Sequence, residues 1–392
     1  MKILSVNVGS SSLKGSLIEL PEQKVLATSY FEKIGMAGSF YTIKINGEKI
    51  RKEVNLVDHS VAVSKLLEEL IENNIISSID EIDGVGHRIA FGGTTFEKSV
   101  ILDEQALEEL AKYNDLVPLH GPVHIMGVRA FMKMLPNVKN VGVFDTAFLS
   151  TMDEEKYIMP VPYEWYEKFG IRRFGYHGTS HRFIAKTVQE FFKRDDLKII
   201  SCHIGSGASI CAIDSGKAID TSMGMGANSG LMMGTRSGDV DNSIIPYVMK
   251  KTGKTLDEVY NDLNKKSGLL GISGVSSDSR DVEEASANGN HRAKLAEEIY
   301  AREISNYIAM FNNELNGADV IVLTAGIGEN SSHMRKMILD RISSLGVKLD
   351  ESKNDFRGEF RLISTEDSKI PVYVIPTDEE LMIALDTMDL IS

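Results

Sequence analysis

Short apolar runs separated by glycine and serine turns open the chain. Residues 3–8 read ILSVNV and are followed by the turn GSSS at 9–12 and a second apolar run, LKGSLIEL. Runs of this length bounded by turn residues predict a buried strand, a tight turn and a second strand. Further strands are expected at 25–32 and 40–45. This part of the chain therefore predicts an antiparallel meander.

Helical periodicity then alternates with apolar runs. Between 57 and 75, leucines and valines recur three and four residues apart, which predicts an amphipathic helix. A strand is expected next at 84–93, followed by a helix at 103–113 and a second helix after the LHGP motif of 119–122. A further strand is expected at 141–148. Such alternation following a meander is typical of an α/β domain.

The opening pattern recurs in the middle of the chain. Residues 199–214 read IISCHIGSGASICAID and match ILSVNVGSSSLKGSLI of 3–18 at an offset of half the 392-residue chain. This match predicts two similar α/β halves, each presenting a glycine-serine hairpin to a cleft between them. A helix is then expected to begin at the capping box Thr255–Glu258, and another to span 293–315. A strand and a glycine turn within 318–332 should lead into a further helix, and a last helix should begin at the acidic run Asp378–Glu380.

Size and composition narrow the class of protein. A chain of 392 residues exceeds what one hydrophobic core usually serves, and 42% hydrophobic with 25% charged residues is ordinary for a globular protein. The net charge of −13 argues against nucleic-acid binding. Cys202 and Cys211 fall on the expected paired strands, which favours buried thiols in a reducing compartment. With no signal peptide or membrane span expected, we predict a cytoplasmic protein.

The segment Asp220–Asp241 combines five glycines with apolar methionines and one cation, Arg236. Glycines allow the backbone to approach a ligand closely, and a lone guanidinium among apolar residues favours an anionic partner. We therefore interpret the segment as a ligand-facing loop. The alternative is a kinked core segment in which Arg236 pairs with Asp239 or Asp241.

Other candidate groups lie at the ends of expected strands and turns. Asn7 and Lys14 flank the first glycine-serine turn, Arg88 ends a strand, and Asp145 ends another, where it could instead cap a turn. Gly178 and the pair Thr179–Ser180 predict a turn and a helix N-cap, so that of the two nearby histidines His181 alone is expected on the helix. Separate glycine turns with cations and carboxylates suited to Mg²⁺ favour phosphoryl transfer.

Together the motifs resemble acetate kinases, which are short-chain carboxylate kinases of the sugar kinase/Hsp70/actin superfamily. The matching motifs span nearly the whole chain in order: VNVGSSSLK, GHRIAFGG, PLHGP, VFDTAF, RRFGYHGTSH, HIGSGASI, DTSMG, GLMMGTRSGDVD, SGVSSDSRD, TAGIGENS and TDEE. The resemblance implies two duplicated ribonuclease-H-like (actin-like) domains, 1–150 with a final helix over about 376–392 packing back on it, and 151–375 as the nucleotide-binding domain. It also implies a homodimer that uses ATP and Mg²⁺ or Mn²⁺ to phosphorylate acetate reversibly by direct in-line transfer.

The same resemblance implies roles for matched residues. Those assigned to catalysis are Arg88, Asp145, His177 and Arg236. Those assigned to the metal are Asn7 and Glu379, and those expected near the phosphates are Ser10, Ser12 and His120. Those assigned to ATP are Lys14, His203, Ile204, Gly205, Ser206, Gly207, Asp278, Ser279, Arg280, Gly326, Ile327, Gly328, Glu329 and Asn330. Those assigned to the carboxylate substrate are Arg88, Ala90, Leu119, Tyr176 and Ala227.

Departures from the family pattern concern the acyl group. Acetate kinases usually read HRVVHGG and MGFTPLEG where this chain has HRIAFGG and MGMGANSG, so Ala90 replaces a valine and Ala227 a proline. Because each buried methylene contributes about 0.8 kcal/mol, the smaller side chains predict that propionate is accepted as well as acetate. The alternatives are a kinase for propionate or another short-chain carboxylate, a sugar kinase, and a non-catalytic nucleotide-binding relative.

Overall fold

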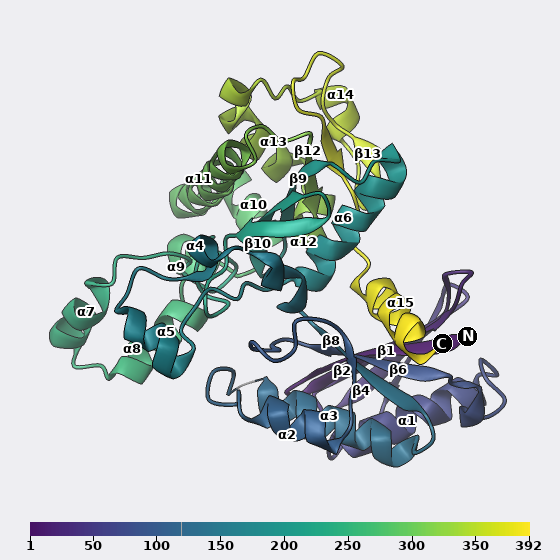
Figure 1. The fold of residues 1–392 in the computed structure, drawn as a ribbon. Helices are drawn as coiled ribbons and strands as arrows, with labels where there is room; N and C mark the ends of the chain where they lie inside the picture. The colour runs from purple at the N-terminus through teal and green to yellow at the C-terminus, as the bar shows by residue number, and fades with distance from the viewer. Residues whose placement is uncertain (119) are drawn as a thin grey trace. The chain divides into compact units, whose positions relative to one another are not determined.

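The computed structural model describes residues 1–118 and 120–392, and the chain forms two compact units. Unit 1 comprises Met1–Ser150 together with Asp378–Ser392, and unit 2 comprises Thr151–Thr377. In Figure 1 the purple start of the chain and the yellow final helix therefore belong to the same unit.

Unit 1 is built on one eight-stranded sheet of order β5-β4-β3-β2-β1-β6-β8-β7. Strands β1 to β5 form an antiparallel meander, and β6 and β8 continue the sheet parallel to β1. Its principal elements are β1 Lys2–Gly9, β2 Ser12–Glu19, β3 Lys24–Glu32, β4 Phe40–Ile45, β5 Glu48–Glu53, α1 His59–Glu72, β6 Gly84–Ile89, β7 Val100–Ile101, α2 Glu104–Ala111, α3 Gly121–Met134, β8 Lys139–Phe144 and α15 Glu379–Ile391.

The two faces of this sheet are covered by different helices, as Figure 1 shows for α1 and α3 on one face and α15 on the other. Side chains of a strand point alternately to opposite faces, and β1 follows that rule. Leu4, Val6 and Val8 join the core cluster that contains the buried residues of α1 and α3, whereas Ile3 packs with Ala384 of α15. Burial on both faces accounts for the nearly continuous apolar run of β1.

Unit 2 contains a six-stranded sheet of order β11-β10-β9-β12-β14-β13. Helix α6 covers one face, and α11 with α13 lies on the other (Figure 1). The elements of unit 2 are α4 Glu154–Tyr157, α5 Tyr163–Phe169, α6 Gly178–Phe192, β9 Lys198–Ile204, β10 Ala208–Asp214, β11 Lys217–Thr221, α7 Ile244–Thr252, α8 Leu256–Lys265, α9 Gly268–Ser273, α10 Ser279–Ala287, α11 His291–Glu314, β12 Val320–Thr324, α12 Ala325–Asn330, α13 Ser332–Arg341, α14 Glu351–Asn354, β13 Arg361–Leu362 and β14 Val372–Val374.

The duplicated α/β fold is confirmed by the strand orders. In unit 1, β3-β2-β1-β6-β8 has three antiparallel strands followed by two parallel ones, and β11-β10-β9-β12-β14 repeats this in unit 2. The matched hairpins occupy equivalent places, with Gly9 opposite Ser12 and Ile204 opposite Ala208. Cys202 and Cys211 lie buried and unbridged on the second hairpin, as expected.

Strand β5 and the turn after β12 are two of the segments that differ from the sequence predictions. Strand β5 was not predicted, because EKIRKE lacks apolar alternation; it is a largely exposed edge strand, where charges discourage pairing with another chain. The glycine turn expected after β12 is instead the short helix α12, which begins at Ala325 with a φ of 64°. A left-handed residue there turns the chain as the expected glycine would.

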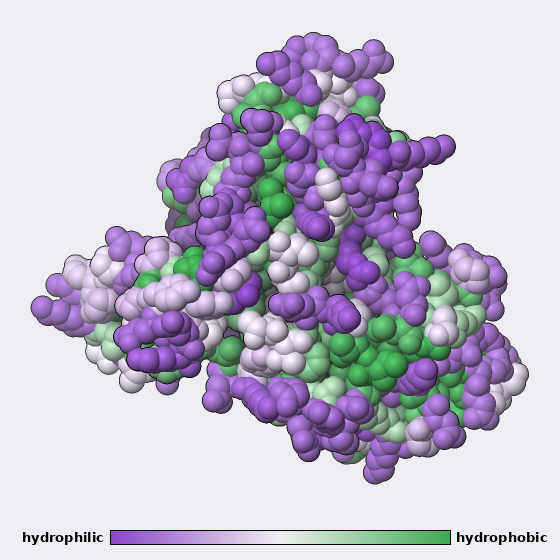
Figure 2. Space-filling model, viewed as in Figure 1, coloured by the Kyte–Doolittle hydropathy of each residue, from purple (hydrophilic) through white to green (hydrophobic). Residues whose placement is uncertain are grey.

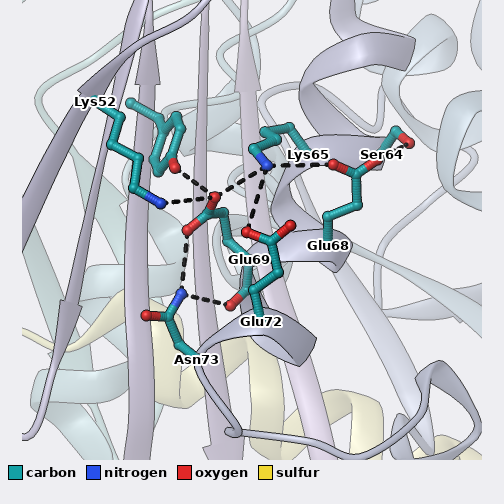
Figure 3. Close-up of polar contacts among 8 residues, drawn as sticks. Lys52, Ser64, Lys65, Glu68, Glu69, Glu72 and Asn73 are labelled. Atoms are coloured by element: carbon teal, nitrogen blue, oxygen red, sulfur yellow. Dashed lines mark hydrogen bonds and ion pairs between the residues drawn. The ribbon is translucent and has the colours of Figure 1, made fainter.

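A buried carboxylate ties helix α1 to the edge of the unit 1 sheet (Figure 3). Glu69 is 1% exposed and accepts hydrogen bonds from Tyr41 Oη and Asn73 Nδ2, with Lys65 Nζ 3.0 Å away. Burial alone would raise the pKa of Glu69, but the hydrogen bonds from Tyr41 and Lys65 outweigh it and lower the pKa. The charge is therefore retained and paired, as a buried charge requires.

Hydrophilic side chains cover most of the molecular face shown in Figure 2. Among residues 1–118 and 120–392, none of the helices is both long enough and apolar enough to cross a lipid bilayer.

Candidate active site

Three neighbouring strands of unit 1 bring predicted site residues to one edge of the sheet, the edge formed by the carboxyl ends of these strands. Asn7 lies near the carboxyl end of β1, Arg88 near that of β6, and Asp145 directly follows β8. The pairing of these parallel strands places their carboxyl ends side by side. Ligand groups of open α/β sheets gather at such an edge.

Arg88 and Asp145 form a two-pronged ion pair at this edge. Arg88 Nη2 lies 2.7 Å and Nε 3.1 Å from Asp145 Oδ2, and the Asp145 side chain is 3% exposed. The Asp145 carboxylate raises the pKa of Arg88, so the guanidinium stays charged. The fork geometry fixes the arginine plane and leaves other donors of the guanidinium available for a carboxylate or phosphate.

The first turn of α15 adds two acidic residues to the same group. Glu379 Oε2 lies 3.7 Å from Arg88 Nε, and burial raises the pKa of Glu379 while Arg88 acts in the opposite direction. Glu380 forms an ion pair with Lys14 of β2. The pair between Glu380 and Lys14 was not predicted, because the two residues are far apart along the chain.

The hairpin turn after β1 presents Ser10 and Ser12, both exposed. A side-chain carbon built at Gly9 would lie 2.6 Å from Ser12 Oγ, so a larger residue there would force the Ser12 hydroxyl to rotate away. His59 of α1 contacts the Gly9 carbonyl oxygen through Nε2 at 2.8 Å and so supports the turn. His59 was not predicted, because it is isolated from every recognised motif.

The remaining predicted residues of unit 1 lie around the start of α3. His120 is the N-cap of α3, and its ring lies 6.1 Å from that of His124, whose pKa burial lowers to about 3. His124 Nδ1 accepts a long hydrogen bond of 3.4 Å from the Ala90 N–H. The prediction for Leu119 falls outside the described residues.

In unit 2 the glycine turn between β9 and β10 brings three predicted residues together. A side-chain carbon built at Gly207 would lie 3.4 Å from His177 Nε2 and 3.6 Å from Arg236 Nη1. An imidazole and a guanidinium thus converge on a backbone position without a side chain. Such an arrangement directs two nitrogen donors of different elements toward the same backbone position, which favours an anionic ligand.

His177 is held by its backbone and by its ring. It is the N-cap of α6 with a φ of 60°, its Nδ1 lies 2.8 Å from Ser209 Oγ, and it stacks on His203 at 4.1 Å between ring centroids. The expected cap at Thr179–Ser180 is wrong, since these residues lie inside the first turn of the helix. The small side chains of Thr179 and Ser180 are buried in the first turn of α6, and His177, with its left-handed backbone, is the residue at which the chain turns into the helix.

The side chain of Arg236 is held by neutral acceptors within its own loop. Arg236 Nη1 donates to the Ala227 carbonyl oxygen at 2.9 Å, and burial lowers the pKa of Arg236. The alternative pairing is not observed, because Asp239 accepts from Gly230 N–H and Asp241 from Ser243. Tyr176, predicted to contact the acyl group, donates from Oη to the Met225 carbonyl oxygen of the same loop at 3.1 Å.

Residues predicted to bind ATP surround the glycine turn of 205–207. A side-chain carbon built at Gly205 would lie 3.8 Å from Gly326 N, and one built at Gly234 would lie 2.9 Å from the Ser277 carbonyl oxygen, just before α10. Because the Gly234 N–H also donates to the Ser206 carbonyl oxygen at 3.1 Å, the turn lies close to the start of 326–330 and to the residues just before 278–280. Glu329 Oε1 accepts from Ala325 N–H at 2.7 Å and from Thr377 N–H at 3.1 Å, so its carboxylate also fixes local backbone.

Oxygen donors at the unit 1 edge fit a magnesium ion. Within residues 1–118 and 120–392, no three His, Cys, Asp or Glu side chains are grouped to hold a metal by themselves. Mg²⁺ commonly takes one or two protein oxygens and completes its shell with phosphates and water. The Asn7 amide and the Glu379 carboxylate, on the contacting elements β1 and α15, are oxygen donors of this type.

The Asp220–Asp241 segment begins at a buried acidic pair, which predicts a pH-dependent stability. Burial raises the pKa of Asp220 to about 6, Arg173 opposes this, and Glu314 adds to it. The native pKa lies above the unfolded value, so this group's contribution to stability is full below about pH 4 and is lost as pH rises through about 6. Asp220→Asn should therefore raise Tm by about 2 °C at pH 7.5 and have little effect near pH 4, where the carboxyl is largely protonated in the folded state, as measured by thermal unfolding. An equal effect at both pH values would contradict this.

Comparison with known proteins gives the family. The model of the Acetokinase family matches residues 2–385. The chain belongs to the acetokinase family. It is 50% identical to an acetate kinase of Bacillus velezensis over 391 residues, with 99% of each chain covered. Among solved structures it matches the Porphyromonas gingivalis acetate kinase (TM-score 0.95, 43% identity, 100% of both chains) and a Francisella tularensis propionate kinase (TM-score 0.94, 38% identity, 99% of both chains).

The acetokinase family match covers both units, and the resemblance inferred from the motifs is confirmed. The acetokinase-family solved structures cover nearly all of this chain, so both sheets described above belong to the family fold.

Proposed function

We propose that this chain is an ATP-dependent acetate kinase that forms acetyl phosphate reversibly and also accepts propionate. The observation that carries the proposal is the convergence of His177 and Arg236 on Gly207, beside the turns predicted to bind ATP. Membership of the acetokinase family supports the same reaction.

The reaction requires a positioned nucleophile and charge neutralisation, and it requires no general base. A carboxylate with a pKa of about 4 to 5, by analogy with Asp and Glu, is ionised at pH 7. One of its oxygens bonds to the γ-phosphorus of ATP while the bond from that phosphorus to the β-bridging oxygen breaks, which leaves ADP. Charge on the equatorial oxygens must be met by fixed donors.

Each group of residues has a role in this proposal. Arg88, oriented by Asp145, binds the carboxylate substrate, and Arg236 with His177 stabilises the transferring phosphoryl group. Because Asp145 is committed to Arg88, it acts as an orienting group rather than as a proton acceptor. When Mg²⁺ is bound, Asn7 and Glu379 would hold it, and the ion would neutralise phosphate charge.

The proposal extends to assembly and location. A homodimer is supported by exposed apolar side chains on three helices of unit 2 that could be covered by a second copy: Tyr163, Trp165, Phe169, Tyr247, Leu256 and Tyr260. A cytoplasmic location is supported by two buried cysteines that are not bridged.

The acyl preference leads to a prediction about Ala90. We expect kcat/KM for propionate to lie within about fourfold of that for acetate, because one methylene contributes about 0.8 kcal/mol. Ala90→Val should lower the propionate-to-acetate ratio by about fourfold or more, since the added methyl groups occupy the same space. Initial rates with both acids measure this. A strict preference for acetate in the unmodified chain would contradict it.

Trapping the product as a hydroxamate tests the proposed function itself. The full chain is incubated with ATP, Mg²⁺ and acetate, propionate, butyrate or glucose, with each component omitted in turn as a control. Hydroxamate is expected with acetate and propionate. ADP formation with glucose alone would favour a sugar kinase, and nucleotide binding without product from any acid would favour a non-catalytic relative.

A further inference from the structure

Helix α11 presents a row of polar side chains to two glycine-containing segments of the candidate site, the turn 205–207 and the loop that carries Arg236. Tyr300, Glu303 and Tyr307 are spaced by three and four residues and therefore share one face of the helix. Glu303 Oε2 accepts the Met232 N–H at 2.7 Å, and Tyr300 Oη lies 3.4 Å from the Gly205 carbonyl oxygen. One rigid helix thus contacts both the glycine turn 205–207 and the loop of residues 230–239 that carries Arg236, called here the arginine loop.

The arginine loop is closed on itself at its ends. Asp239 Oδ1 accepts the Gly230 N–H at 2.8 Å, and the Asp239 N–H donates back to the Gly230 carbonyl oxygen at 2.9 Å. Tyr307 Oη donates to the other carboxylate oxygen of Asp239 at 2.9 Å. Gly238 has a φ of 70°, and a side-chain carbon there would lie 2.6 Å from the Gly230 carbonyl oxygen. Residues 230–239 therefore form a ring that contains Arg236.

Glu303 fixes the first part of this ring, at Met232. Its hydrogen-bond partner Met232 is followed by Met233, whose N–H donates to the Arg236 carbonyl oxygen at 3.0 Å. Leu231, Met232 and Met233 are all buried, so this part of the loop cannot shift without disturbing the core. A carboxylate acceptor forms a stronger hydrogen bond to a backbone N–H than a neutral group does. Two hydrogen bonds thus connect Arg236 to α11: the Met233 N–H donates to the Arg236 carbonyl oxygen, and the neighbouring Met232 N–H donates to Glu303.

We propose that Glu303 is a positioning residue that holds the Met232 N–H and thereby sets the location of the Arg236 guanidinium. The inference rests on the proposed role of Arg236 in phosphoryl transfer. Glu303 does not touch the reacting atoms in this scheme; it acts through the loop. Asp239 and Tyr307 secure the ends of the same ring.

Three variants of the full chain test this. Glu303→Ala removes the acceptor, Glu303→Gln keeps an oxygen at the same reach, and Glu298→Ala changes an exposed acid on the same helix. We expect Glu303→Ala to lower kcat about tenfold while KM for ATP stays within threefold, because a small displacement of a positioned group lowers the rate steeply. Peptides covering 230–239 should also exchange amide hydrogen faster. Glu303→Gln and Glu298→Ala should stay within threefold of the unmodified chain.

Two results would overturn the proposal. One is unchanged hydrogen exchange over 230–239 in Glu303→Ala. The other is an equal loss of kcat in the alanine and glutamine variants, which would indicate a role for the charge rather than for the acceptor. If the unmodified chain forms no acyl phosphate, the proposed function fails, whereas the exchange comparison still decides whether Glu303 anchors the loop.

Discussion

Arg236→Ala is expected to lower kcat for acetyl phosphate formation by about a thousandfold. Removing one preorganised donor from a site where charge develops commonly lowers rates a hundredfold to a thousandfold, and a full guanidinium charge lies at the upper end. The fold should persist, because Arg236 donates to a backbone carbonyl and a methionine sulfur and not to a buried carboxylate. Steady-state rates and thermal unfolding measure the two effects.

Arg194→Ala is the matched control for this variant. Arg194 is an exposed arginine of unit 2 that pairs with Asp196 at 2.9 Å, and its removal should leave kcat unchanged. Arg236→Lys keeps the charge and loses the planar fork, so an intermediate rate is expected. A kcat for Arg236→Ala within tenfold of the unmodified chain, with the fold intact, would remove Arg236 from the proposed mechanism.

Asp145→Asn should lower kcat/KM for acetate about a hundredfold and also reduce stability. The amide keeps the shape of the carboxylate but loses the charge that orients Arg88 and offsets its burial. Breaking a buried ion pair by neutralising one partner destabilises by about 3 kcal/mol, and here the lower end applies because the Arg88 side chain is 25% exposed. Rates at several acetate concentrations and denaturant unfolding measure these changes.

An exposed aspartate provides the comparison. Asp80 lies on the surface of unit 1 with its carboxylate 2.9 Å from Ser78 Oγ, and Asp80→Asn should change neither rate nor stability appreciably. If Asp145→Asn lost stability but kept kcat/KM within threefold, Asp145 would be a structural partner of Arg88 without a role in orienting it for the substrate.

Much of the fold could be predicted because its signals are local. The apolar runs of β1 and β9, the glycine turns after them and the capping box at Thr255 all act within a few residues, and the structure contains each of them. The repeat at half the chain length predicted the duplication, because equal strand-turn-strand patterns impose equal hairpins. Strand β5 escaped prediction because an exposed edge strand needs no apolar face.

The partners of the site residues could not be predicted in the same way. The ion pair between Lys14 and Glu380, the contact of His59 with Gly9, and the bond from Met232 to Glu303 each join residues that only the tertiary fold brings together. The sequence indicated Arg88 and Asp145 because each lies at the end of an apolar run, and Arg236 because it is the one cation of a glycine-rich segment. It carried no local signal for the groups that hold them in place.

The membership of α15 in unit 1 has a consequence for the order in which the protein is made. This helix covers one face of the first sheet and brings Glu379 to Arg88, yet it follows the whole of unit 2 in the sequence. On a ribosome, the apolar face around Ile3 must stay uncovered while residues 151–377 are synthesised. Nascent chains are prone to aggregation at such surfaces. Maturation of the first sheet is thus coupled to completion of the second, and a translation product interrupted within unit 2 lacks both the covering helix and the carboxylate beside Arg88.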